Sequence, residues 1–230
     1  MPPPRAVVFD MDGLMFNTED VYWEVGKRLL GRRGREFTRE LSDAMMGRPP
    51  QPCFEIMIRW HGLNETWEQL AAESEGLYVE LLDQYLAPMP GLLRLLDALE
   101  AAGLPKAICT SSSRRLLTAV LSRFEMEPRF QFTLTSEDIT HGKPHPEIYL
   151  KAAERFSVRP GEMLVLEDSE AGCRSGAAAG AFVVAVPGAH SQNHDFRPAS
   201  MVAGSLADPG IYAALGLDPT ETAHIPPGVA

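Results

Sequence analysis

The clearest pattern in the chain is a set of short, mostly apolar runs, each followed by polar residues. A continuous run of four or five apolar residues is typical of a strand buried on both faces, as in a parallel sheet. The predicted strands cover residues 6–9, 106–110, 132–135, 163–166 and 182–186, with a candidate edge strand at 201–202.

Between these runs the apolar positions recur at helical spacing. Helices are predicted at 91–102, 114–124 and 146–156, and another, rich in alanine and glycine, follows residue 169. Strands that alternate with helices imply right-handed βαβ units and a parallel sheet. From about Asp208 the chain carries proline, glycine and few core signals, so we expect a tail there.

Residues 21–86 interrupt this alternation, because their periodicity is helical throughout. We predict roughly four helices there. The first strand must belong to the same sheet as the later ones, so the helical segment is an insertion after it. The predicted fold is therefore α/β: a doubly wound parallel-sheet (Rossmann-like) core of residues 1–16 and 89–230, with an inserted helical cap of residues 17–88 that selects the substrate.

The composition indicates a globular protein with a sizeable core, since 45% of the 230 residues are hydrophobic. A formal net charge of -10 argues against a nucleic-acid backbone or an anionic membrane as partner. No apolar run approaches the roughly 20 residues that span a bilayer. Three cysteines without CxxC spacing, and no signal-peptide pattern, predict a cytoplasmic location. We expect a monomer or a weak homodimer.

Chemically active side chains follow the strong strands. They are Asp10 and Asp12 after the first strand, Thr110 and Ser111 after the second, and Glu167 and Asp168 after residues 163–166. Lys143 lies on a loop between glycine and proline, ahead of the helix at 146–156. In a doubly wound sheet these loops meet at one edge, where ligands bind.

Several carboxylates at one edge repel one another and call for a cation. All-oxygen ligands without a His/Cys cluster favour Mg²⁺, which leaves room for phosphate and water. A carboxylate nucleophile, a lysine, hydroxyl donors and a second carboxylate as acid and base complete the equipment for phosphoryl transfer.

Four short motifs occur in order along the chain: Asp10-Met11-Asp12-Gly13, Thr110-Ser111-Ser112, Gly142-Lys143-Pro144 and Glu167-Asp168-Ser169. Together they resemble the signature motifs of the haloacid dehalogenase (HAD) superfamily of hydrolases, and the helical insertion resembles its helical cap. Segments 17–19, 141–146 and 166–172 are closest to the beta-phosphoglucomutase-like branch, which includes sugar-phosphate phosphatases, pseudouridine-5'-phosphatase-type enzymes and the mutase. The resemblance covers roughly residues 5–190.

The resemblance implies a role for each matching residue. Asp10 would be the nucleophile and a Mg²⁺ ligand. Asp12 would be the general acid and base, and would ligate Mg²⁺ through its backbone carbonyl. Asp168 would ligate Mg²⁺ directly, and Glu167 directly or through water. Lys143 would neutralise charge during catalysis.

The phosphate would be bound by Thr110, Ser111, Ser112 and Lys143, again by resemblance. In the cap, Arg48 stands at a helix break and is a candidate substrate contact, although a solvated arginine is an equal reading. Asn17 stands where relatives often carry aspartate, which bears on the connector to the insertion rather than on the chemistry.

The first hypothesis is a Mg²⁺-dependent phosphatase that hydrolyses a small phosphorylated metabolite, a sugar or nucleoside phosphate, through an aspartyl-phosphate. The alternative is a beta-phosphoglucomutase-like phosphosugar mutase, because both reactions share the first half-reaction. The Pro49-Pro50 pair matches the mutase's cap pattern poorly, which favours the hydrolase. An idle binding protein on this fold would leave the carboxylate set without a purpose.

His141 and His145 are four residues apart, a spacing that brings side chains together on a helix. Pro144 and Pro146 deny them that helix. We therefore expect two loop histidines rather than a pair of metal ligands.

Overall fold

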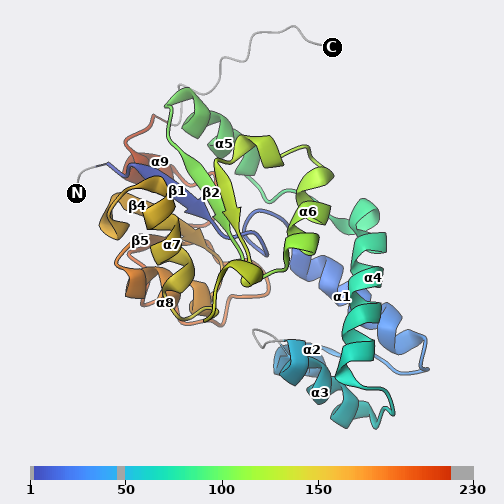
Figure 1. The fold of residues 1–230 in the computed structure, drawn as a ribbon. Coiled ribbons are helices and arrows are strands. Elements are labelled where there is room, and N and C mark those ends of the chain that lie inside the picture. The colour runs from blue at the N-terminus through green and yellow to red at the C-terminus, as the bar shows by residue number, and fades with distance from the viewer. Residues whose placement is uncertain (1–2, 46–49, 219–230) are drawn as a thin grey trace, which may run out of the picture. The chain divides into compact units, whose positions relative to one another are not determined.

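A parallel sheet forms the centre of the larger of two units. The computed structural model describes residues 3–45 and 50–218, and within them the strand order is β3-β2-β1-β4-β5-β6, with all neighbours parallel. The strands are β1 (Ala6–Phe9), β2 (Lys106–Cys109), β3 (Phe132–Leu134), β4 (Met163–Glu167), β5 (Phe182–Ala185) and β6 (Met201–Val202) (Figure 1).

The two central strands explain the continuous apolar runs. Every residue of β1 and of β4 is buried. Val8 lies opposite Ala107 of β2 on one side and Val165 of β4 on the other. A strand with neighbours on both edges and helices on both faces has no solvent side, so polar alternation is absent.

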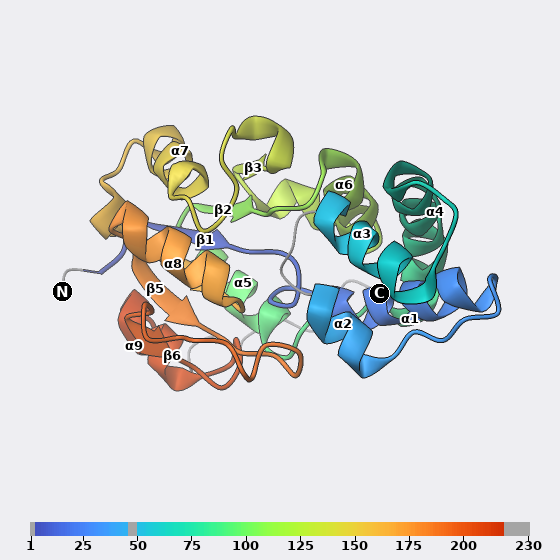
Figure 2. The same ribbon diagram turned by 90° about the horizontal axis from the view of Figure 1, so that it is seen from below.

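Helices cover both faces of the sheet. On one face, α7 (Glu147–Phe156) and α8 (Glu170–Ala179) pack against a cluster that includes Val8 and Val165 (Figures 1 and 2). On the other face, Phe9 packs edge-on against Phe130, with ring centroids 6.0 Å apart. Phe130 follows α6 (Arg114–Ser122) in the chain. The predicted doubly wound α/β fold is thus confirmed.

The helix α5 (Leu92–Ala101) lies on the same face as Phe130. Arg129, the neighbour of Phe130, pairs with Asp97 and Glu100 of α5. Glu100 is also bound by Lys106 at 2.9 Å. The Arg129 hydrogen bond, with help from Lys106, lowers the pKa of Glu100 to about 2, so this carboxylate is charged at neutral pH.

The prediction of a tail beyond Asp208 was wrong for its first residues, because a helix begins there. The helix α9 (Pro209–Leu215) buries Ile211 and Tyr212. Asp208 is its N-cap and accepts a hydrogen bond from the backbone of Gly210 at 2.8 Å. Proline in the first turn is compatible with a helix start, so Asp208 and Pro209 act here as start signals.

The chain divides into two compact units, residues 1–16 with 87–230, and residues 17–86. The smaller unit is helical where it is described. Its helices are α1 (Thr18–Gly31), α2 (Arg39–Met45), α3 (Pro50–His61) and α4 (Trp67–Tyr85). Tyr22 of α1 packs on Tyr78 of α4, with ring centroids 4.6 Å apart.

Asn17 ties the beginning of the smaller unit to its end. Its side-chain amide donates to the Tyr85 carbonyl at 3.0 Å and to the Asp20 carboxylate at 3.1 Å. An ionised aspartate has no hydrogen to donate, so it could make neither bond. Within the described ranges, no helix combines the length and the apolar character needed to cross a membrane.

Candidate active site

The carboxyl edge of the sheet fixes the first residues beyond the strands. The Asp10 backbone N–H donates to Leu166 and that of Thr110 to Leu134, each at 3.0 Å. These bonds continue the sheet pairing by one residue past β1 and β2. The side chains that follow are therefore held by backbone that belongs to the sheet rather than to a free loop.

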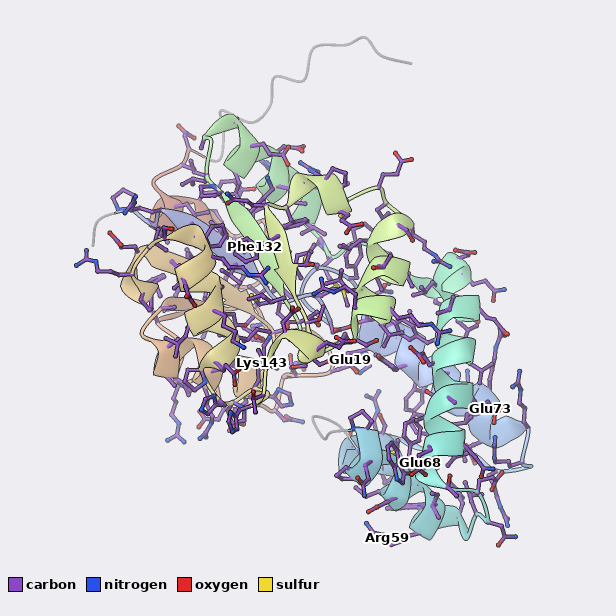
Figure 3. All side chains as sticks on the ribbon, viewed as in Figure 1. Glu19, Arg59, Glu68, Glu73, Phe132 and Lys143 are labelled. Atoms are coloured by element: carbon purple, nitrogen blue, oxygen red, sulfur yellow. The ribbon has the colours of Figure 1, made fainter. Side chains whose placement is uncertain are left out.

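Lys143 connects two of the predicted carboxylates. Its ammonium donates to Asp10 Oδ1 at 2.5 Å, to Glu167 Oε1 at 2.6 Å and to the Cys109 carbonyl at 3.0 Å. The three charged side chains are 5%, 8% and 0% exposed for Lys143, Asp10 and Glu167. Figure 3 labels Lys143, which precedes α7. Charges buried this far require close partners, and here each one has them.

Burial also shifts the protonation equilibria of this group. Burial raises the pKa of Asp10 to about 8; Lys143 opposes the rise, and Glu167 and Asp12 add to it. Burial alone would lower the pKa of Lys143, but Asp10 and Glu167 hold it well above its ordinary value. Asp10, Glu167 and Asp12 interact electrostatically around a single ammonium, so a further cation would be stabilised here.

Tyr149 is a site residue that the sequence reasoning missed. Its hydroxyl donates to Glu167 Oε1 at 2.5 Å, and Lys143 Nζ lies 5.2 Å from the centre of its ring. Ser169 Oγ donates to the other Glu167 oxygen at 3.1 Å. Both carboxylate oxygens are thus held. Helical periodicity marks Tyr149 as a buried position, but it does not reveal a partner 18 residues away on another element.

Replacing Tyr149 with phenylalanine is expected to lower the free energy of unfolding by about 1.5–3 kcal/mol, because a buried hydrogen bond to a carboxylate is lost. Chemical denaturation measures the loss. Tyr212→Phe is the matched control, since that buried hydroxyl has no hydrogen-bond partner in the described structure. The importance assigned to the Tyr149 hydroxyl is contradicted if both variants unfold alike.

Two glycines make room for the carboxylates. A Cβ on Gly13, whose φ is +73°, would lie 2.3 Å from Asp168 Oδ2. A Cβ on Gly172 of α8 would lie 1.9 Å from the carboxylate carbon of Glu167. The small residues after β4 therefore do more than allow helix-to-sheet packing: one of them admits the Glu167 side chain itself.

Gly172→Ala is expected to cost at least about 1–3 kcal/mol of stability, because the new methyl group must displace a buried carboxylate. Gly76→Ala in α4 is the control, since nothing lies within 4 Å of a Cβ at that position. There the change should stabilise by roughly 0.5–1 kcal/mol. If thermal unfolding showed equally small effects for Gly172→Ala and Gly76→Ala, the Glu167 carboxylate would tolerate a methyl group at position 172.

Asp12 is held by the hydroxyls after β2. Its Oδ2 accepts from Thr110 Oγ1 at 3.0 Å and from Ser112 Oγ at 2.7 Å. Its Oδ1 is buried and lacks a hydrogen-bond partner in the described part of the chain. Ser111 lies between the two hydroxyl donors with an exposed side chain. The structure thus brings Thr110 and Ser112 to the second carboxylate of the first motif.

Asp10, Glu167 and Asp168 each offer an oxygen to one group whose ligand atoms all lie within 4.8 Å of one another. The unpartnered Asp12 oxygen adds a further buried acceptor. A set of oxygens with excess negative charge fits Mg²⁺, which prefers carboxylates and water to nitrogen or sulfur. The residues present therefore fit the predicted ion.

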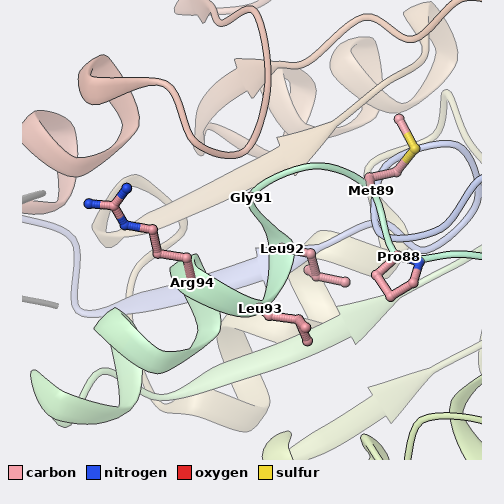
Figure 4. A pocket seen from close by; sticks show the side chains of 6 residues that line it. All are labelled: Pro88, Met89, Gly91, Leu92, Leu93 and Arg94. Carbon is pink, nitrogen blue, oxygen red and sulfur yellow. The ribbon is translucent and has the colours of Figure 1, made fainter. Parts of the chain in front are cut away.

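Arg48, the candidate substrate contact of the insertion, lies outside the described residues. A pocket at the start of α5 is lined by Pro88, Met89, Gly91, Leu92, Leu93 and Arg94 (Figure 4). It contains no carboxylate, which distinguishes it from the acidic group after β1 and β4.

The family of the chain follows from its sequence matches. The model of the haloacid dehalogenase-like hydrolases matches residues 7–186. The chain therefore belongs to this family of enzymes. It is 32% identical over 207 residues to a probable pseudouridine-5'-phosphatase of Drosophila melanogaster, covering 87% of this chain and 89% of that protein.

A second relative is the bifunctional riboflavin kinase/FMN phosphatase of Arabidopsis thaliana. It is 30% identical over 204 residues, or 88% of this chain, and the chain spans 54% of that protein's length. The crystal structure of CbbY from Rhodobacter sphaeroides in complex with phosphate matches with a TM-score of 0.81 at 23% identity, covering 93% of this chain and 100% of that one. This similarity supports the fold assignment.

Proposed function

We propose that the chain is a Mg²⁺-dependent phosphatase that hydrolyses a small phosphomonoester, a sugar or nucleoside phosphate, through an aspartyl-phosphate on Asp10. Relatives named as phosphatases of pseudouridine 5'-phosphate and of FMN support this substrate class. The helical unit of residues 17–86 would select the substrate. The three free cysteines support a reducing, cytoplasmic location.

The observation that carries the proposal is the ion-pair group at the carboxyl edge of the sheet. Asp10, Lys143 and Glu167 come from three separate segments and are joined at 2.5 and 2.6 Å while almost fully buried. Structural stability alone rarely favours such a group over apolar side chains. Phosphoryl transfer does need it, because charge must be neutralised where the phosphate reacts.

In the first half-reaction an Asp10 carboxylate oxygen attacks phosphorus, and the bond from phosphorus to the ester oxygen breaks. Asp12 donates a proton to the departing oxygen, so the product leaves as an alcohol. Its Oδ2 is occupied by Thr110 and Ser112, which leaves the buried Oδ1 as the oxygen to carry the proton.

In the second half-reaction Asp12 takes a proton from water as that water attacks phosphorus. The bond between phosphorus and the Asp10 oxygen breaks, which releases inorganic phosphate and restores both aspartates. Lys143 neutralises charge on the phosphoryl group and keeps Asp10 oriented in both steps. Ser111, whose side chain is exposed, would bind a phosphate oxygen, whereas the hydroxyl hydrogens of Thr110 and Ser112 are donated to Asp12.

Asp10, Glu167, Asp168 and the Asp12 backbone carbonyl would hold Mg²⁺. When bound, the ion supplies positive charge that offsets the repulsion between the Asp10 carboxylate and the phosphate dianion. The chain's own contribution is to hold the oxygens close together, with Tyr149 and Ser169 fixing Glu167.

Mg²⁺ binding is expected to release a proton and to strengthen as the pH rises toward 8. The metal-free pKa of Asp10 is raised to about 8, and the ion binds the carboxylate rather than the acid. Below that pH the affinity should therefore rise by about tenfold per pH unit. Calorimetry at pH 6 and 8, in buffers of different ionisation enthalpy, measures both effects. Equal affinity at the two pH values in wild type, or the same proton release from Asp10→Asn, would refute this expectation.

Phosphorus NMR tests the proposed function. The protein is incubated with Mg²⁺ and a panel of sugar and nucleoside phosphates, beside Asp10→Asn and a sample with EDTA. Growth of inorganic phosphate that both the variant and EDTA abolish is the expected result. Conversion of one phosphate ester into another without free phosphate would identify a mutase instead. No reaction across the panel would contradict the proposed substrate class.

A further inference from the structure

Three metal-ligating side chains meet outside the acidic edge, on the loop before α7 and in its first turn. They are His141, His145 and Glu147, and each offers one ligand atom within 4.8 Å of the others. The imidazole rings of the two histidines lie 4.6 Å apart, at an angle of 37°. Both histidines are exposed, so an ion here would keep open positions for water.

A turn brings the histidines together where the prolines prevent a helix. The His145 backbone N–H donates to the Gly142 carbonyl at 3.0 Å, which folds the loop back on itself. The Glu147 carboxylate accepts from the backbone of Thr140 at 2.9 Å and of His141 at 2.8 Å. A turn closed by a carboxylate thus brings the two rings together without helical backbone.

Glu147, the third potential ligand, is charged, and its carboxylate already accepts hydrogen bonds. The Lys151 hydrogen bond, followed by backbone N–H groups of Thr140 and His141, lowers the pKa of Glu147 to about 2, so it is ionised at neutral pH. Lys151 occupies Oε1 at 2.8 Å. The other oxygen, Oε2, faces His141 Nδ1 at 3.2 Å. These two atoms are close enough to bind the same ion.

We propose that His141, His145 and Glu147 form a surface site for a divalent transition ion of the Zn²⁺ type. Two imidazoles and one carboxylate are a donor set that such ions prefer, whereas Mg²⁺ prefers oxygens alone. The site shares no residue with the Asp10, Glu167 and Asp168 group. It also does not depend on the proposed phosphatase activity.

The position of the site gives it a consequence for the loop. Its ligands lie on both sides of Gly142-Lys143-Pro144, the segment that carries the lysine bound to Asp10 and Glu167. A bound ion links the two ends of this segment and restricts its motion. Zn²⁺ is therefore expected to slow amide hydrogen exchange over residues 140–147.

The test is titration calorimetry of the full chain with Zn²⁺ in excess Mg²⁺, which keeps the acidic group occupied. We expect one Zn²⁺ per chain, and a loss of affinity of about tenfold or more in His141→Gln and in His145→Gln. His190→Gln, a loop histidine outside the cluster, is the control and should bind as wild type does. Hydrogen exchange with and without Zn²⁺ is measured on the same four proteins.

Each outcome decides for or against the site. Weakened binding in both cluster variants, with exchange at 140–147 slowed by Zn²⁺ only in wild type and His190→Gln, supports it. Undiminished binding in the cluster variants would place the ion elsewhere and overturn the proposal. Absence of Zn²⁺ binding in excess Mg²⁺ would overturn it as well. Because both substituted side chains are exposed, the variants are expected to fold, and circular dichroism verifies this.

Discussion

Replacing Asp10 with asparagine is expected to reduce kcat by on the order of 10³-fold or more, since a side-chain amide cannot form the covalent bond to phosphorus. Asparagine has nearly the same shape as aspartate and retains an oxygen that can accept from Lys143. The burial of Asp10 raises its pKa, so removing this charge does not cost the fold a favourable ionisation. The loss should therefore appear in turnover, with the circular dichroism spectrum and the unfolding transition preserved.

Asp83→Asn is the control for this experiment. That residue lies on an exposed part of α4, and its substitution should leave kcat unchanged. Initial rates on p-nitrophenyl phosphate and on the best metabolite of the panel give the comparison. Activity near that of wild type in folded Asp10→Asn would show that Asp10 is not the nucleophile.

Lys143→Met is expected to lower the free energy of unfolding by about 3–5 kcal/mol, the cost of removing one partner from a buried ion pair. Asp10 and Glu167 would remain, 8% and 0% exposed, with no ammonium between them. Chemical denaturation near neutral pH measures the loss. The pKa of Asp10, which burial raises to about 8 against the opposing effect of Lys143, should rise further in the variant, so the deficit should be larger above pH 8 than below it.

Lys27→Met provides the comparison for Lys143. Lys27 pairs with Glu24 at 2.8 Å, but its side chain is 50% exposed, and such pairs contribute less than about 1 kcal/mol. If Lys143→Met lowered the free energy of unfolding as little as Lys27→Met does, the buried ion pairs of Lys143 with Asp10 and Glu167 would not stabilise the fold as proposed. Turnover by the folded Lys143→Met protein should also fall, since no ammonium would neutralise the phosphoryl group that is being transferred.

The sheet was predictable because its strands are buried on both faces. A run such as residues 6–9 has no polar alternation, and only a central parallel strand explains it. The convergence of Asp10 and Glu167 was predictable too, since parallel strands end at one edge. These inferences need only local pattern and the rules of strand connection.

The details that could not be predicted from the sequence depend on packing between distant segments. Tyr149 matters because its hydroxyl donates to Glu167, and Gly172 matters because a Cβ there would collide with the same carboxylate. Neither partner can be inferred from periodicity. The short helix α9 was missed for a different reason, because its start signals, Asp208 and Pro209, are also the residues of turns.

The stereochemical course at phosphorus distinguishes attack by Asp10 from direct attack by water. The phosphoryl group of the substrate carries three different oxygen isotopes and is transferred to an acceptor alcohol. The configuration of the resulting chiral ester reports whether the phosphorus centre is inverted. Attack by Asp10 and then by water or alcohol comprises two in-line displacements, so overall retention of configuration is expected. Inversion would mean a single displacement without a phosphoryl-enzyme, and would contradict the proposed role of Asp10.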